Sequence, residues 1–165
     1  MIILTGASGG IGRAILSSLT ALDSVVAIYN TKAPDINEIS GVTLYQLDLT
    51  SEEQIANFTS DMKGRLKNIT LIHAAALSKD GLAAKFSTEN WEQVINVNLR
   101  GNFLLTRAML VPMMEEKWGR VIHLSSVAGI RGMPGTIAYS TTKTGLLGLS
   151  RVLASEYARF GVTSN

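Results

Sequence analysis

Short apolar runs alternate with helical patterns along the 165-residue chain, and no other feature limits its fold so strongly. We expect strands at residues 2–5, 24–29, 42–47, 69–75 and 120–125, and a last strand that begins near Val162. We expect helices at about residues 10–22, 51–62, 88–115 and 139–159. This alternation is typical of a parallel sheet whose two faces are both covered by helices. The length suits one domain, so the sequence predicts a single α/β domain, residues 1–165, built on a doubly wound parallel sheet.

A glycine-rich segment follows the first expected strand and leads directly into the first expected helix. Residues 5–12 read TGASGGIG, a Gly-x-x-x-Gly-x-Gly spacing rather than the common Gly-x-Gly-x-x-Gly fingerprint. Glycine lets the backbone turn sharply and approach a phosphate, while a helix N-terminus offers free N–H groups and a positive dipole end. We therefore expect a nucleotide-phosphate site here, with a tight turn that binds nothing as the alternative. The expected binding residues are Gly6, Ser8, Gly10, Ile11 and Gly12.

A second pattern lies toward the other end of the chain, where Ser126, Tyr139 and Lys143 follow one another. Tyr139 and Lys143 are four residues apart, so in a helix both side chains lie on one face within reach of each other. An ammonium group beside a phenol favours the phenolate and lowers the pKa of a tyrosine toward neutrality. Such a tyrosine can exchange a proton at physiological pH, and a serine hydroxyl can hold the oxygen that receives it. Taken alone, the pair is better explained by a surface helix on which a tyrosine packs against a lysine stem, so its context decides.

Three motifs in this order resemble the short-chain dehydrogenase/reductase family. The segment Thr5-Gly6-x-x-x-Gly10-Ile11-Gly12 is similar to the cofactor loop of that family. Residues 96–101 (NVNLRG) are similar to its helix motif with an active-site asparagine, here Asn98, and Ser126, Tyr139 and Lys143 have its spacing. The resemblance covers nearly the whole chain and implies a Rossmann-type fold. It also implies hydride transfer between a nicotinamide and a carbonyl or alcohol carbon, in which the protein orients the reactants and handles the proton.

The resemblance implies a role for each residue of this set. Tyr139 protonates the forming alkoxide, and Lys143 holds the nicotinamide ribose and lowers the pKa of the tyrosine. Ser126 donates a hydrogen bond to the substrate oxygen, and Asn98 anchors a water that joins Lys143 to solvent as a proton relay. Ser125 is the alternative to Ser126. The spacing to Tyr139 favours Ser126, because Ser125 on the same strand should point to the opposite face.

The end of the second expected strand bears on the choice between NAD and NADP. An acidic residue there binds the ribose hydroxyls of NAD, whereas a basic residue accommodates the phosphate of NADP. This chain has Asn30, Thr31 and Lys32 at that place, and Arg13 is a second cation near the same pocket. We therefore expect NADP in preference to NAD, bound in part by Asn30 and Lys32. The alternative for Lys32 is an ordinary solvated loop lysine.

Three further positions belong to the cofactor site by resemblance. Asp48, after the third expected strand, accepts a hydrogen bond from the adenine amino group, and Leu49 supplies a backbone contact. Residues 73–76 (HAAA) stand where the family usually has Asn-Asn-Ala-Gly, and small residues such as Ala75 still permit close packing against the adenosine. His73 is better explained as a hydrogen-bonded core histidine than as a ligand. With two isolated histidines, no cysteine and no clustered acids, we expect no metal site.

Two segments resemble the 3-oxoacyl-(acyl-carrier-protein) reductases of this family, which act in fatty acid biosynthesis. They are residues 78–91, with a lysine–aspartate pair and a tryptophan, and residues 116–120 (EKWGR). Acyl carrier proteins are acidic, so surface cations can steer one electrostatically. The cations concerned are Lys79, Lys85, Lys117 and Arg159. The alternative is that these are scattered surface charges and that the substrate is a small ketone, a sugar or a polyketide.

Composition agrees with a soluble enzyme of the cytoplasm. Apolar residues make up 46% of the chain and charged residues 17%, and the net charge of +2 is not gathered in a basic block, so we expect no nucleic-acid partner. The absence of cysteine excludes disulfides and thiol chemistry. We expect neither a signal peptide nor a membrane span. By resemblance we expect a homo-oligomer, a dimer or a tetramer, formed through the helices near 88–115 and 139–159.

Members of the family continue past the sixth strand with a substrate-covering loop and a seventh strand, whereas this sequence ends at Asn165. Residues 1–165 are therefore expected to lack the C-terminal strand and substrate loop, which would leave an apolar edge exposed. Either the polypeptide is longer than these 165 residues or it is a truncated product, and we favour the longer polypeptide. A second class of function follows from this expectation, namely an inactive, truncated scaffold that holds NADP without turnover. A methyltransferase on a similar sheet is a third class, and it assigns no role to Tyr139 and Lys143.

Overall fold

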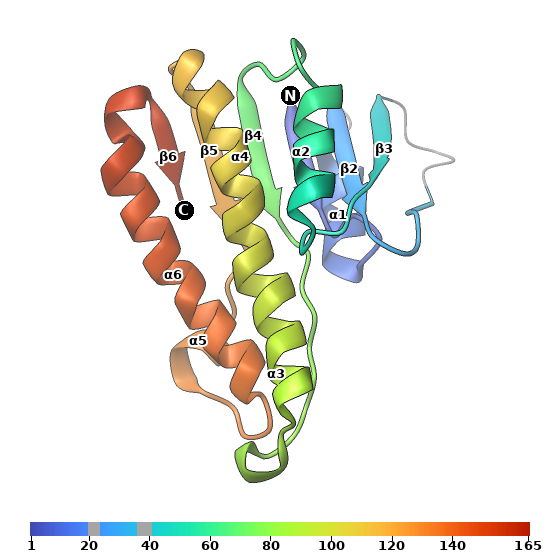
Figure 1. Cartoon of the computed structure of the whole chain (residues 1–165), viewed down its shortest axis with the longest axis vertical. Helices are drawn as coiled ribbons and strands as arrows, with labels where there is room; N and C mark the ends of the chain where they lie inside the picture. The colour runs from blue at the N-terminus through green and yellow to red at the C-terminus, as the bar shows by residue number, and fades with distance from the viewer. Residues whose placement is uncertain (20–23, 36–40) are drawn as a thin grey trace.

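The computed structural model describes residues 1–19, 24–35 and 41–165, and these form a parallel sheet of six strands (Figure 1). The strands are β1 (Ile2–Thr5), β2 (Val25–Tyr29), β3 (Val42–Gln46), β4 (Ile69–His73), β5 (Gly119–His123) and β6 (Val162–Ser164). Their order is β3-β2-β1-β4-β5-β6, and every neighbouring pair is parallel. The connections therefore change direction between β1 and β4, which is where open parallel sheets bind ligands beyond the carboxyl ends of their strands. The predicted Rossmann-type sheet is confirmed.

Helices connect the strands and cover both faces of the sheet. They are α1 (Gly10–Leu19), α2 (Glu52–Asp61), α3 (Thr88–Ile95), α4 (Gly101–Glu115), α5 (Ala128–Arg131) and α6 (Ile137–Tyr157), with short turns η1 (Ala83–Lys85), η2 (Asn96–Arg100) and η3 (Ala158–Phe160). In Figure 1, α2, α4 and α6 lie on the face toward the viewer and α1 lies behind the sheet. This is the arrangement that the alternation of strands and helices predicts.

Two apolar layers, one on each face of the sheet, hold the helices in place. Ile3 packs on one face in a cluster with Phe58 of α2, while Leu4 packs on the other face with Leu16 of α1. All four side chains are fully buried. Successive strand residues point to opposite faces, so a strand buried on both faces needs a continuous apolar run. Complete burial of each such side chain contributes roughly 1.5–3 kcal/mol to the free energy of unfolding.

The observed elements differ from the predicted ones chiefly at their ends. β4 ends at His73 rather than at residue 75, and β5 covers 119–123 rather than 120–125. Shortly beyond each strand end, the backbone and side chains bond to helices: Leu77 N–H donates to the Asn98 side chain, and Ser125 Oγ donates to the Lys143 carbonyl. α6 begins two residues before its predicted start, at Ile137. The predicted end of the first helix, at residue 22, lies outside the described residues.

The long helix predicted at 88–115 is interrupted by a π-helical turn, η2, between α3 and α4. Its closing bond runs from Gly101 N–H to the carbonyl of Asn96. Gly101 also lies against Leu49, and a Cβ added at this glycine would stand 2.9 Å from the Leu49 Cβ. π turns are rare and occur frequently at functional sites. This one turns Asn98 inward, where only 1% of it is exposed.

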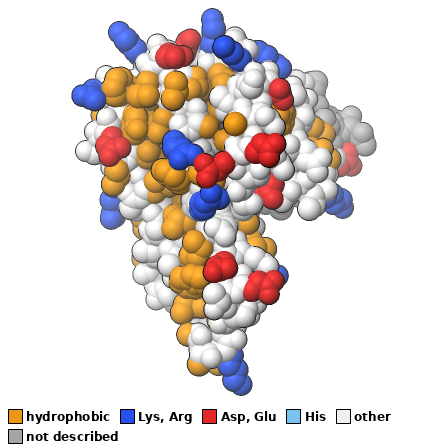
Figure 2. Space-filling model, in the orientation of Figure 1, with side chains coloured by type: hydrophobic (Ala, Val, Ile, Leu, Met, Phe, Trp, Pro, Cys, Tyr) orange, Lys and Arg blue, Asp and Glu red, His pale blue; other side chains and the backbone are white. Residues whose placement is uncertain are grey.

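The face of the molecule formed by α4 and α6 carries apolar side chains at its surface. Figure 2 shows hydrophobic side chains gathered along these two helices. Phe103 and Val111 of α4 and Val152 of α6 are 44%, 53% and 53% exposed. Within the described residues, none of the helices combines the length and apolar character needed to cross a bilayer.

Candidate active site

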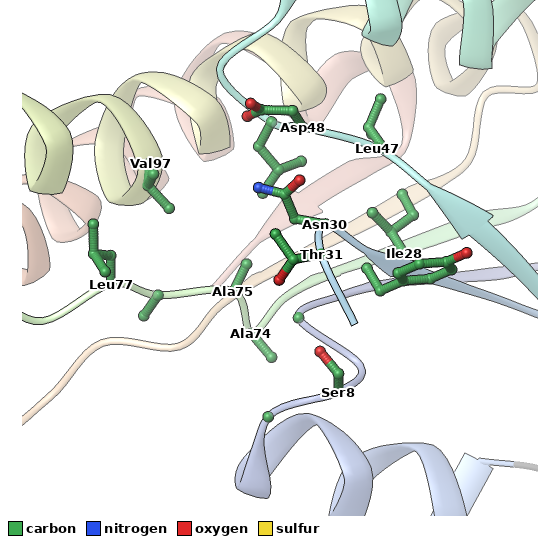
Figure 3. Close-up of a pocket in the computed structure, with 15 residues that line it drawn as sticks. Ser8, Ile28, Asn30, Thr31, Leu47, Asp48, Ala74, Ala75, Leu77 and Val97 are labelled. Atoms are coloured by element: carbon green, nitrogen blue, oxygen red, sulfur yellow. The ribbon is translucent and has the colours of Figure 1, made fainter. Parts of the chain in front are cut away.

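A pocket of about 420 Å³ opens beyond the carboxyl ends of the strands on the β1–β3 side of the sheet. Figure 3 shows its walls, which come from the segments that follow β1, β2, β3 and β4, with Val97 of η2 on one side. Six of the predicted cofactor residues line it: Gly6, Ser8, Asn30, Asp48, Leu49 and Ala75. The other predicted cofactor residues do not line it: Gly10, Ile11, Gly12, Lys32, Tyr139 and Lys143.

The glycine-rich turn between β1 and α1 needs glycine at two positions and leaves a third one open. Gly6 has a φ of +67°, and a Cβ there would lie 2.6 Å from the Ala75 backbone. A Cβ at Gly12 would collide with the carbonyl of Gly6. Gly10 is different, because a Cβ at this first residue of α1 would meet nothing within 4 Å. The turn therefore presents the first turn of a helix, with its free N–H groups, to open space.

Asp48 is held in a fixed orientation at the mouth of the pocket (Figure 3). Its Oδ1 accepts hydrogen bonds from the backbone N–H and the hydroxyl of Thr50, each at 2.8 Å. Its backbone N–H donates to Gln54 Oε1 at 2.8 Å. Both side-chain bonds use the same oxygen, so the carboxylate retains acceptor capacity on Oδ2.

The first three residues after β2 are Asn30, Thr31 and Lys32, none of which is acidic. Asn30 and Thr31 line the pocket, and the Asn30 carbonyl accepts a hydrogen bond from Gln46 Nε2 at 2.8 Å. Lys32 and Arg13 are both exposed and lie outside the lining.

Tyr139 and Lys143 lie on one face of α6, as the helical spacing predicts. The Lys143 Nζ stands 5.4 Å from the centre of the Tyr139 ring and donates a hydrogen bond of 2.6 Å to the carbonyl of Leu124. Only 4% of Lys143 is exposed, and this burial lowers the pKa of its ammonium group. Tyr139 itself is half-buried. The arrangement places a buried cation beside a phenol that remains accessible from solvent.

Ser125 and Ser126 both lie beyond the end of β5, so the expectation that strand alternation separates them is wrong. The hydroxyl of Ser125 donates to the carbonyl of Lys143 at 3.0 Å. The Ser126 Oγ instead accepts from the Ala128 N–H at 3.2 Å, which leaves its own proton free to donate. Hydrogen bonding, rather than strand geometry, now distinguishes the two hydroxyls.

Asn98 joins the pocket wall to the segment that carries Tyr139 and Lys143. Its side-chain oxygen accepts from the Leu77 N–H at 2.7 Å. Its amide nitrogen donates to the Leu77 carbonyl at 2.8 Å and to Thr142 Oγ1 at 3.2 Å. Because both N–H donors and the oxygen of this side-chain amide bond to the protein, Asn98 holds Leu77 and Thr142 together.

The two histidines lie side by side in the core, a pairing that the sequence analysis missed. The β4–β5 register sets His73 opposite His123, and their rings stack with centroids 5.1 Å apart and planes 2° from parallel. His73 Nε2 is hydrogen-bonded to Thr106 Oγ1 at 2.8 Å, which confirms its interpretation as a core histidine. Burial, followed by the charge of Lys143, lowers the pKa of His123 to about 4. In the sequence, the one sign of this pairing is that each histidine is the last residue of an apolar strand, and the two strands are neighbours in the sheet.

Among the described residues, no three His, Cys, Asp or Glu side chains group as metal ligands would.

Comparisons with known proteins agree with this geometry. The family model described as short chain dehydrogenase matches residues 1–165. The chain is 36% identical over 173 residues to the 3-oxoacyl-(acyl-carrier-protein) reductase FabG of Aquifex aeolicus (strain VF5), covering 99% of this chain and 70% of that protein. It is 34% identical over 169 residues to nodulation protein G of Rhizobium sp. (strain N33), covering 99% of this chain and 69% of that one.

A solved structure shares the fold at similar identity. The crystal structure of a short-chain dehydrogenase from Streptomyces avermitilis superposes with a TM-score of 0.89 at 30% identity. The match covers 98% of this chain and 63% of the solved one. The chain thus spans less than two thirds of that protein and about 70% of the two curated relatives.

Proposed function

Because the chain belongs to the short-chain dehydrogenase family, we propose that it is an oxidoreductase that reduces a carbonyl group to an alcohol with NADP(H). The observation that carries this proposal is the contact between Lys143 and Tyr139, next to a pocket with a glycine-rich turn at its edge. A buried ammonium beside an accessible phenol is suited to moving a proton, and the pocket is suited to holding a dinucleotide.

The residues of the pocket fit a nicotinamide dinucleotide. The open space at Gly10 and the first turn of α1 suit a phosphate, and the anchored Asp48 suits an adenine amino group. Ala74, Ala75 and Ala76 leave room for a flat ring system against the sheet. When bound, the nicotinamide would supply the hydride. NADP is preferred to NAD because Asn30 and Thr31 offer no carboxylate, while Lys32 and Arg13 supply positive charge nearby.

The proton chemistry falls to side chains of this chain. Tyr139 gives its phenolic proton to the substrate oxygen, and the ammonium of Lys143 stabilises the negative charge left on the tyrosine. Ser126, whose Oγ accepts from the Ala128 N–H and whose own proton has no acceptor among the described residues, donates a hydrogen bond to the same substrate oxygen. Asn98 fixes Thr142, the neighbour of Lys143, and we assign to Asn98 the anchoring of a relay water that joins Lys143 to solvent.

For the substrate, we favour a 3-oxoacyl thioester carried by an acyl carrier protein. The relatives that bear this name support the choice, as do the surface cations Lys79, Lys85, Lys117 and Arg159, which suit an acidic partner. A reductase of small ketones, sugars or polyketides is the alternative within the family. An inactive NADP-binding scaffold is the alternative from another class.

We also propose that two or more copies associate through the apolar surface of α4 and α6.

NADPH oxidation with a 3-oxoacyl thioester on acyl carrier protein tests the proposal. We expect turnover by the wild type, and a fall in kcat of roughly 10²–10⁴-fold in Tyr139→Phe because the general acid is lost. Tyr157→Phe, at the other end of α6, is the matched control and should keep its activity. We expect Ser126→Ala to lose more activity than Ser125→Ala.

Each contrary result has a distinct meaning. Turnover with a free ketone but not with the 3-oxoacyl thioester would show that the substrate is a small ketone rather than an acyl chain on a carrier protein. NADPH binding without oxidation by any ketone would favour the scaffold. Full activity in Tyr139→Phe would refute the assigned chemistry.

A further inference from the structure

Four buried polar side chains form a cluster between the sheet and α4, directly beneath the candidate active site. They are His73 and His123, which end β4 and β5, and Asn102 and Thr106 of α4, and none is more than 9% exposed. A buried polar group costs free energy unless it is hydrogen-bonded. One nitrogen of each ring, His73 Nδ1 and His123 Nε2, has no partner among the described residues. The cluster therefore lowers the free energy of unfolding. Its hydrogen bonds connect it to Asn98.

The hydrogen bonds determine which way the cluster is oriented. Asn102 Nδ2 donates to the backbone carbonyl of Asn98 at 2.8 Å, so Asn102 Oδ1 is the atom that faces His123. The His123 Nδ1 lies 3.3 Å from that oxygen. An amide oxygen only accepts, so His123 must carry its proton on Nδ1. The histidine thereby fixes the amide of Asn102, and Asn102 fixes a carbonyl of the π-helical turn.

A chain of hydrogen bonds connects Asn98 to the segment that carries Tyr139 and Lys143. The Asn98 side chain donates to Thr142 Oγ1, and Thr142 Oγ1 in turn donates to the carbonyl of Tyr139 at 2.7 Å. Lys143 follows Thr142 in the chain, and its Nζ is bonded to the residue after His123, Leu124. His123 therefore reaches the Tyr139–Lys143 segment along two paths, through Asn102 and through its own backbone neighbour.

We propose that His123 and Asn102 are positioning residues, which hold the carbonyl of Asn98 in the π-helical turn and through it the placement of Tyr139 and Lys143. Neither residue lines the pocket, so Asn102 acts through Asn98 and Thr142, and His123 acts through Asn102 and through its chain neighbour Leu124. The inference rests on the proposed function, because positioning is measured most directly by its effect on carbonyl reduction. Small displacements of catalytic groups lower kcat steeply, whereas the binding of a substrate held elsewhere changes little.

Substitutions within the cluster separate positioning from packing. His123→Phe keeps a flat buried ring but removes the donor to Asn102, whereas His123→Asn keeps an N–H near the position of Nδ1. We expect kcat to fall about 10- to 100-fold in His123→Phe and in Asn102→Leu, with KM changed less than about threefold. His123→Asn should restore most of the lost kcat. Thr106→Val is the matched control. It removes the bond to His73 from the same cluster, but Thr106 is not one of the residues whose hydrogen bonds connect His123 to Tyr139.

A measurement on the cofactor-free protein keeps this test independent of the proposed function. By NMR, His123 should show a proton on Nδ1 and a bare Nε2. Burial lowers the pKa of Lys143 in the wild type, so loosening its segment in Asn102→Leu should admit water and return this pKa toward its ordinary value, whereas Thr106→Val should leave it unchanged. A wild type that reduces no carbonyl would end the proposed function and leave this comparison standing. Unchanged kcat and Lys143 pKa in Asn102→Leu, or equal losses in Thr106→Val, would overturn the inference.

Discussion

Three neighbouring bases, Lys143, His73 and His123, lie in the core, and burial lowers the pKa of each. Desolvation disfavours the protonated form, and positive charges placed close together disfavour one another further. The charge of Lys143 contributes to the lowered pKa of both histidines. Acidification therefore protonates histidines in the unfolded chain before it protonates them in the folded protein.

The first prediction at this scale concerns stability against pH. His123 titrates near 6.5 when unfolded and at about 4 when folded, so between these values the unfolded state binds more protons. The free energy of unfolding should fall as pH falls through this window, by up to about 3 kcal/mol from His123 alone. Urea unfolding of wild type and His123→Asn at about pH 7 and pH 4 measures the difference. Equal losses of stability in the two proteins would contradict the prediction.

The residues of the site differ in how well the sequence could predict them. The approach of Lys143 to Tyr139 depends only on the helical period, and it was predictable. The choice between Ser125 and Ser126 depends on which hydroxyl bonds to the protein, and the Ser125 hydroxyl bonds to the Lys143 carbonyl, a contact across 18 positions. The stacked histidines depend on the register of β4 against β5, which no local pattern encodes.

At the scale of elements, the first turn of α1 separates two kinds of glycine. Gly12 is required by the fold, because any side chain there would strike the Gly6 carbonyl. A Cβ at Gly10 would meet no protein atom within 4 Å, so the fold itself does not require glycine there. A bound phosphate would explain a glycine at this position.

The two glycines are expected to respond differently to alanine. Gly10→Ala should leave the free energy of unfolding within about 0.5 kcal/mol of wild type, yet weaken NADPH binding at least about tenfold. Gly12→Ala should destabilise the fold by about 1–3 kcal/mol. Gly148→Ala in α6, where a Cβ also meets nothing, is the control and should bind NADPH normally. Titration calorimetry and urea unfolding check both effects. Undiminished NADPH affinity in Gly10→Ala would contradict the phosphate site.

Elements whose signal is local were predictable, and those that depend on tertiary contacts were not. The apolar strands and the amphipathic helices follow from residue period and length. The π-helical turn depends on the close approach of Gly101 to Leu49, which lies 52 positions earlier in the chain and which no local pattern encodes. α5 has four residues, too few for a helical period to be visible.

At the scale of the whole molecule, the exposed apolar surface of α4 and α6 predicts self-association (Figure 2). Val152→Glu places a charge in this surface and should lower the mass measured by light scattering from that of a dimer or tetramer toward that of one chain. Ser18→Glu on the exposed side of α1 is the control and should not change the mass. A wild type that is monomeric at all concentrations would refute the prediction.

Lys143 exchanges hydrogen bonds with the two residues just beyond β5, donating to the Leu124 carbonyl and accepting from the Ser125 hydroxyl. The lysine is thus tied to the sheet without help from residues 130–136, which form the outer part of the connection to α6. That connection lies beside Leu82 and Ile137 at the surface. We therefore expect that changes of length or sequence in residues 130–136 would reshape this part of the surface without moving Lys143.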